Sequence, residues 1–113
     1  MRWCEMGKGD FLGEFEQLLL VALIRLGPNA YGVPIRQEIS KRTGREVPIG
    51  QVYATLDRLE RKGYVSSRLG EPTPERGGRA KRYFQIEAPG IRAFNASQQM
   101  MARMAEGLVV MGA

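Results

Sequence analysis

The first part of the chain carries apolar residues at the spacing of a helix. From Phe11 to Leu26 they fall at positions 11, 12, 15, 18, 19, 22, 23 and 26, and Gly27-Pro28 predicts the end of the helix. Leu20, Val21 and Ile24 lie on roughly the opposite side, so the helix is apolar on two faces. The second face can pack under another helix of the chain or against a second copy, and the small remaining core favours the copy. We therefore expect Leu20 and Ile24 at a dimer interface.

Two further helices are predicted before the chain changes its pattern. The first covers Val33 to Arg42, and the second begins near Ile49 and reaches Lys62, where Gly63 favours a left-handed cap. The later helix has one narrow apolar sector, made of Ile49, Val52, Leu56 and Leu59. Its far side is polar, basic or small, with Gln51, Ala54, Arg58 and Arg61 projecting and Tyr53 and Thr55 on the flanks. Such a helix packs by one side and leaves the other for a partner.

Short strands and a last helix complete the chain. Residues 64–69 and 81–86 predict an antiparallel hairpin, joined by the Pro/Gly-rich stretch 70–80. The last helix is predicted from Pro89 to about Leu108. Along this helix, residues follow one another at a 3-4-3-4-3 spacing that is typical of helix-on-helix association. This seam consists of Ile91, Phe94, Gln98, Met101, Ala105 and Leu108. We expect this seam at the dimer interface.

Composition excludes several classes of protein. With 113 residues, 43% of them hydrophobic, the chain fits one globular domain. The longest apolar run is far short of the ~20 residues of a membrane span, and the N-terminus lacks a signal-peptide layout, so we expect a cytoplasmic protein. One cysteine and no histidine exclude an internal disulfide and the usual zinc and imidazole sites. Nucleotide-binding and nucleophile-elbow motifs are also missing, so we expect neither an enzyme nor a cofactor or metal.

Positive charge is concentrated in the middle of the chain. Residues 36–82 contain twelve Lys or Arg against six Asp or Glu, whereas the remainder contains five against six. Four of these cations lie in or beside the connection 70–80, namely Arg76, Arg79, Lys81 and Arg82. A local basic surplus is typical of a surface that neutralises phosphates, although a solvated basic face without a partner has the same composition.

The order of the elements favours DNA. Three helices followed by a basic hairpin is the order of a winged helix-turn-helix, a mainly α fold with a small β-hairpin (α+β). In that fold the third helix enters the major groove, and the hairpin, or wing, reaches neighbouring phosphates or the minor groove. Prolines in the wing restrict its unfolded state, and its cations replace condensed counterions.

Several motifs in this order resemble the PadR family of bacterial transcriptional regulators. They are the "YG" start of the second helix, "VYATLDRLERKG" in the third, and the wing "RGGRAKRYF", and the similarity covers roughly residues 13–95. The resemblance implies a winged-helix dimer formed through the N-terminal and last helices, in the compact subgroup with one C-terminal helix. We divide the chain into an N-terminal segment 1–10 without periodic context, a DNA-binding domain 11–87, and a dimerisation helix and tail 88–113 in the same globular unit.

The resemblance also implies which residues meet DNA. Gln51, Tyr53 and Thr55 match the start of the recognition helix, and Arg79, Lys81 and Arg82 match the basic wing. The helix starts depart from the family pattern, because neither Pro48-Ile49-Gly50 nor Ile86-Glu87 offers a hydroxyl cap.

Each of these residues also has an ordinary structural alternative. Gln51 can pair with adenine or simply face water, and Tyr53 can reach phosphate or lie half-buried against the second helix. Arg58 and Arg36 are phosphate candidates, and for Arg36 the alternative is a salt bridge to an acid such as Glu38 or Glu60.

The sequence therefore predicts a homodimeric regulator that binds a palindromic operator in double-stranded DNA. The resemblance implies a repressor of stress, detoxification or transporter genes. The alternative is a winged-helix module that docks an acidic protein surface without binding DNA. The sequence leaves open whether a small-molecule effector exists.

Overall fold

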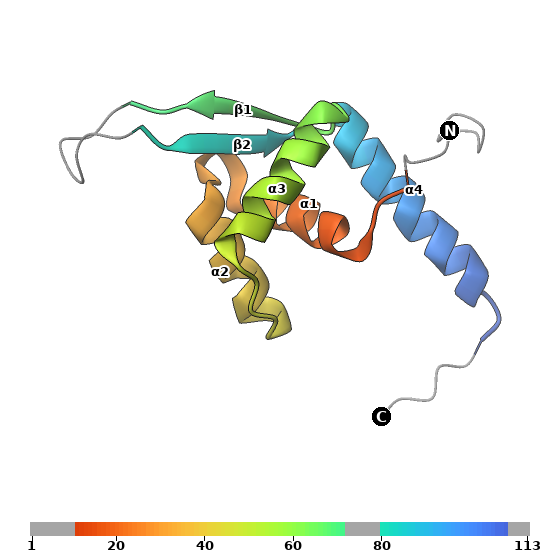
Figure 1. The fold of residues 1–113 in the computed structure, drawn as a ribbon. Helices are drawn as coiled ribbons and strands as arrows, with labels where there is room; N and C mark the ends of the chain where they lie inside the picture. Colours follow the sequence, from red (N-terminus) through yellow and green to blue (C-terminus); the bar gives the residue numbers. More distant parts are fainter. Residues whose placement is uncertain (1–10, 72–79, 109–113) are drawn as a thin grey trace.

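A computed structural model describes residues 11–71 and 80–108 and shows three packed helices below a two-stranded hairpin, with a fourth helix leading away (Figure 1). The helices are α1 (Glu14–Leu26), α2 (Gly32–Thr43), α3 (Ile49–Arg61) and α4 (Ala88–Ala105), with a single 3-10 turn, η2 (Gly27–Asn29), after α1. The strands are β1 (Val65–Leu69) and β2 (Arg82–Ile86), paired antiparallel. The predicted mainly α fold with a small hairpin is confirmed. The N-terminal segment 1–10 lies outside the described residues.

The helix ends follow local backbone chemistry. Gly27 and Gly63 adopt positive φ angles of 68° and 83°, which residues with a Cβ rarely reach, so the chain turns there as predicted. The starts of α3 and α4 have no side-chain cap, in line with Pro48 and Glu87 at those positions. The predicted end of the last helix is wrong, because α4 stops at Ala105 and Leu108 lies beyond it.

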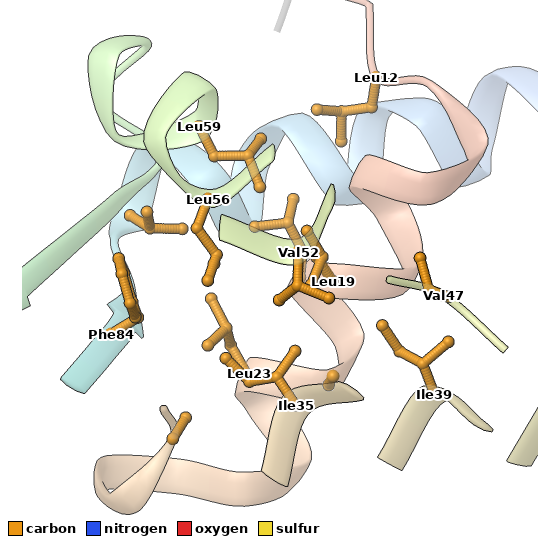
Figure 2. Close-up of a cluster of buried hydrophobic side chains, with 14 of the residues drawn as sticks. Leu12, Leu19, Leu23, Ile35, Ile39, Val47, Val52, Leu56, Leu59 and Phe84 are labelled. Atoms are coloured by element: carbon orange, nitrogen blue, oxygen red, sulfur yellow. The ribbon is translucent and has the colours of Figure 1, made fainter. Parts of the chain in front are cut away.

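The hydrophobic core lies where α1, α2, α3 and the hairpin meet (Figure 2). Leu19, Ile35, Leu56 and Phe84 come from four different elements and are 0 to 1% exposed. Burying a leucine or phenylalanine side chain contributes about 1.5–3 kcal/mol, so these residues hold the three helices and the hairpin together.

Leu20 belongs to this core and not to an outer apolar face. It is 0% exposed, because α1 contacts α2, α3, β2 and α4 and is covered on several sides. The prediction that Leu20 lies at a dimer interface is therefore wrong. Ile24, one turn later on α1, is 52% exposed and remains available.

The hairpin is attached to the helices at several points. Its register pairs Val65 with Ile86 and Leu69 with Arg82. The backbone N–H of Phe84 donates to the carbonyl of Ala30 at 2.8 Å, which ties β2 to the segment between η2 and α2. Strand β2 also contacts α1 and η2, and β1 contacts α3, so the paired strands are held from both sides.

The first half of α4 packs against the body, and its second half does not. Gly90, Ala93 and Ser97 are buried, whereas all positions from 101 to 108 are exposed.

At the start of α4, hydrogen bonds from the Ser66 hydroxyl and the Gln85 amide lower the pKa of the Glu87 carboxyl. None of the helices within the described residues is both long and apolar enough to cross a membrane.

Candidate nucleic-acid interface

The recognition-helix candidate α3 buries one side and exposes the other. Its exposed residues include Gly50, Gln51, Tyr53, Ala54, Arg58 and Arg61. A Cβ added at Gly50 would meet nothing within 4 Å, so the first turn stands in open space. The small residues Gly50 and Ala54 therefore leave room for a large partner to approach the backbone of α3.

Thr55 does not lie on this exposed side. It is 2% exposed, and its Oγ1 accepts a 3.4 Å hydrogen bond from an Arg58 guanidinium N–H. The expectation that Thr55 contacts DNA is wrong. Thr55 lies on the same side of α3 as Val52 and Leu59, and this side faces the core.

Gln51 and Arg58 border a groove of about 460 Å³ between α3 and the start of α1. The buried carboxylate of Glu16 forms one wall and is only 6% exposed. Its oxygens accept from the Gly13 N–H at 2.8 Å and pair with Lys62 at 3.3 Å and with the Arg58 Nε at 3.6 Å.

The role of Glu16 is not among the sequence predictions, although the sequence contains a signal for it. Glu16 precedes Leu19, Leu20 and Leu23 by three, four and seven positions, so it lies on the buried face of α1. A carboxylate there needs a cation, and Arg58 of α3 and Lys62 at its end provide it. Part of the basic charge of α3 thus has an internal partner.

Tyr53 lies against the beginning of α2. Its exposed fraction is 37%, and a Cβ at Gly32 would be 2.3 Å from its hydroxyl oxygen. Tyr53 therefore contacts the second helix, as the alternative predicted, although its side chain stays exposed. A contact between the hydroxyl and phosphate stays a prediction.

Arg82 is engaged inside the protein. Its Nη1 donates to Asp57 at 3.2 Å, its Nη2 to Glu60 at 2.5 Å, and its Nε to the Ser67 hydroxyl at 3.1 Å. The guanidinium also lies over the Phe84 ring, 4.8 Å from the centroid. Two carboxylates hold the charge of Arg82 in the free protein, and the expectation that Arg82 binds phosphate stays a prediction.

Lys81 and Arg36 are placed differently from Arg82. Lys81 is exposed, with its Nζ 4.5 Å from the Tyr31 ring centroid and within 3.3 Å of the Tyr31 hydroxyl. Arg36 is exposed on α2 and has no ion pair with any described residue. Both acids considered as its partners are taken, because Arg42 binds Glu38 and lowers the pKa of that carboxyl, and Arg82 binds Glu60. Arg76 and Arg79 lie outside the described residues.

The chain matches a known family. The family model described as the transcriptional regulator PadR-like family covers residues 19–96, more than half of the chain. The chain belongs to the PadR-like family. No significant match was found among curated proteins.

Solved structures agree with the PadR-like fold. A PadR-like transcription factor from Bacteroides fragilis superposes with a TM-score of 0.69 at 21% identity, over 81% of this chain and 84% of that one. A PadR-like transcriptional regulator from Bacillus cereus gives 0.64 at 19% identity, over 89% of each chain. A transcriptional regulator from Clostridium thermocellum gives 0.65 at 24%, over 84% and 89%. At these identities the likeness establishes the fold, and the descriptions are of transcriptional regulators rather than enzymes.

The seam expected for pairing is exposed on this PadR-like chain. Ile91 is 43% exposed, Met101 66% and Leu108 68%, and Gln98 and Ala105 are also exposed. Phe94 is half-buried because it packs against the core. Within the described part of the chain nothing covers the distal turns of α4.

Proposed function

We propose that this chain is a homodimeric, sequence-specific DNA-binding transcriptional repressor, in which α3 enters the major groove and the hairpin contacts the flanking backbone. The observation that carries the proposal is the exposed side of α3, small at Gly50 and Ala54 and accompanied by cations without an ion-pair partner among the described residues. These cations include Arg36, Arg61 and Lys81. Because free cations release counterions from DNA when they meet phosphates, they supply affinity for any sequence. Gln51, exposed near the start of α3, is the candidate for reading bases.

Pairing of two chains is part of the proposal. The distal half of α4 exposes Met101 and Met104, and Leu108 just beyond its end is exposed as well. Apolar side chains this exposed are stabilised when a second copy covers them. Two recognition helices held about 34 Å apart can read the two halves of a palindrome, whereas one small domain binds weakly at physiological salt. Ile24 of α1 and the seam Ile91, Phe94, Gln98, Met101 and Ala105 are the proposed contacts.

A salt titration tests the DNA-binding part. The affinity of the purified protein for a duplex from its own upstream region is measured at several salt concentrations, and log affinity should fall steeply and linearly with log salt. In the variant Arg36→Gln/Lys81→Gln the plot of log affinity against log salt should become less steep, by about 3 to 4 in slope. A dimer of this variant loses four phosphate contacts, and each contributes about 0.9 to the slope. Gln51→Ala should instead relax the choice at particular bases.

The matched control is Arg103→Gln, which removes the same kind of charge from α4, on the side opposite the seam. Its slope should equal that of the unaltered protein. A protein that ignores duplexes in dilute buffer would contradict the proposal and favour the protein-docking module. Footprinting on the same upstream region, with transcription measured in the presence and absence of the protein, separates repression from activation.

A further inference from the structure

The cluster around Arg82 connects the wing to the recognition helix. Arg82 begins β2, Ser67 is the middle residue of β1, and Asp57 and Glu60 lie three residues apart on α3. Each of the three guanidinium nitrogens has a separate acceptor. Ser67 closes the ring by donating its hydroxyl to Glu60 Oε2 at 2.8 Å. Both strands of the hairpin are therefore bonded to one helix, β2 through Arg82 and β1 through Ser67.

The surroundings make the contact directional. The guanidinium stands over the Phe84 ring at the rim of the core, and Phe84 itself is 1% exposed. A planar guanidinium with fixed donor directions suits this arrangement, whereas the three donors of a lysine ammonium lie around one nitrogen and have no fixed planar geometry. The contact therefore sets an orientation of the hairpin as well as a distance.

The charges of the cluster oppose a role in phosphate binding. Asp57 and Glu60 together carry two negative charges on α3, and Arg82 supplies one positive charge. If Arg82 moved to a DNA phosphate, it would leave both carboxylates unpaired next to the polyanion, where they repel it. The arrangement is most favourable when Arg82 stays with Asp57 and Glu60.

We propose that Arg82 is a positioning residue that, with Asp57, Glu60 and Ser67, locks the paired strands β1 and β2 at a fixed angle to α3, so that α3 and the hairpin meet the duplex together. This inference rests on the proposed function. Strands β1 and β2 held in place before binding need no reorientation when DNA arrives, and loss of the lock weakens binding without loss of a phosphate contact. The lock also gives Asp57 and Glu60, two acids near the DNA-facing side, a positive contribution to DNA affinity.

Two substitutions distinguish the lock from simple electrostatics. Glu60→Gln removes a negative charge near the DNA, so charge alone predicts tighter binding, whereas the lock predicts binding about tenfold weaker. Arg82→Lys keeps the positive charge, so a phosphate contact would retain most of its affinity, whereas the lock predicts a similar loss of about tenfold. In Arg82→Lys the salt slope should equal that of the unaltered protein. Glu46→Gln is the control for charge, since Glu46 is exposed and has no ion pair with the described residues, and it should not weaken binding.

A measurement without DNA tests the lock on its own. The Gly70 N–H donates to the Lys81 carbonyl at 2.8 Å just beyond the paired strands. In Arg82→Lys its hydrogen exchange should be about tenfold faster, while amides in the middle of α1 keep their protection, which also shows that the variant is folded. Unchanged exchange at Gly70, or tighter DNA binding by Glu60→Gln, would overturn the lock. Failure of the unaltered protein to bind any duplex would instead reject the proposed function, a different outcome of the same titrations.

Discussion

Gly90 lies at a close approach of α4 to the rest of the molecule, and Gly90→Ala should destabilise the fold. A Cβ at this position would be 2.3 Å from the carbonyl oxygen of Tyr64 and 3.0 Å from Ile86 Cγ1. Ordinary carbon-to-oxygen contacts begin near 3.3 Å, so α4 must move by about 1 Å. The obstacle is backbone, and the same Tyr64 carbonyl accepts the Glu87 N–H at 2.9 Å, so the shift also strains that hydrogen bond.

The magnitude follows from three contributions. Overpacking costs about 1–3 kcal/mol, and the weakened hydrogen bond adds about 0.5–1.5 kcal/mol. The better helix propensity of alanine returns about 0.5–1 kcal/mol. The net loss is about 0.5–4 kcal/mol, which lowers Tm by about 2–16 °C for a domain near this size.

Thermal unfolding followed by far-UV circular dichroism, at one protein concentration for all variants, measures the effect. Gly50→Ala is the matched control, because its Cβ would meet nothing within 4 Å in the first turn of α3. It should raise Tm by about 2–4 °C through helix propensity alone. If Gly90→Ala unfolded at or above the temperature of the unaltered protein, the close packing of α4 on Tyr64 would be refuted.

Three further predictions concern binding, pH and assembly. Thr55→Val should leave duplex affinity within about twofold, because the buried hydroxyl cannot reach DNA, and a tenfold loss would place it at the interface. The lowered pKa of Glu87 stabilises the fold above its unfolded pKa of about 4.3, and this stability is lost as pH falls through the lower folded value. Glu87→Gln should therefore unfold at lower temperature than the unaltered protein at neutral pH, with the gap closing below about pH 4; a gap independent of pH would contradict this. Met101→Asp should halve the mass measured by light scattering, whereas an unchanged mass would exclude α4 from the interface.

The elements of the fold can be predicted from the sequence because each depends on local chemistry. Apolar spacing indicates α1, α2 and α3, and glycine after Leu26 and after Lys62 marks two ends correctly. The predicted end of α4 is too late, because Leu108 continues the apolar spacing although Gly107, with a φ of 81°, turns the backbone before it. The spacing of apolar residues does not show that one glycine turns the backbone and so ends the helix.

The candidate site is harder to predict because it depends on which charges meet in three dimensions. Arg82 looks like its basic neighbours in the wing, yet only the register of β1 and β2 brings it to Asp57 and Glu60. From the sequence, Leu20 looks like part of an outer face. A helix that is distant in the sequence covers this side of α1, and such coverage leaves no pattern in the residues around Leu20.

The distribution of pairs changes what the basic surplus means. Within the described part of residues 36–82, five cations have ion pairs: Arg42, Arg45, Arg58, Lys62 and Arg82. Three of these use the acids Glu14 and Glu16 of α1, which a count restricted to the basic middle of the chain leaves out. The pairs of Arg58, Lys62 and Arg82 hold α3 and the paired strands in place. We expect the unpaired cations to be the ones that replace counterions on DNA. The salt dependence of binding should therefore be set by the unpaired cations. The relative orientation of the DNA-binding elements should be set by the paired cations.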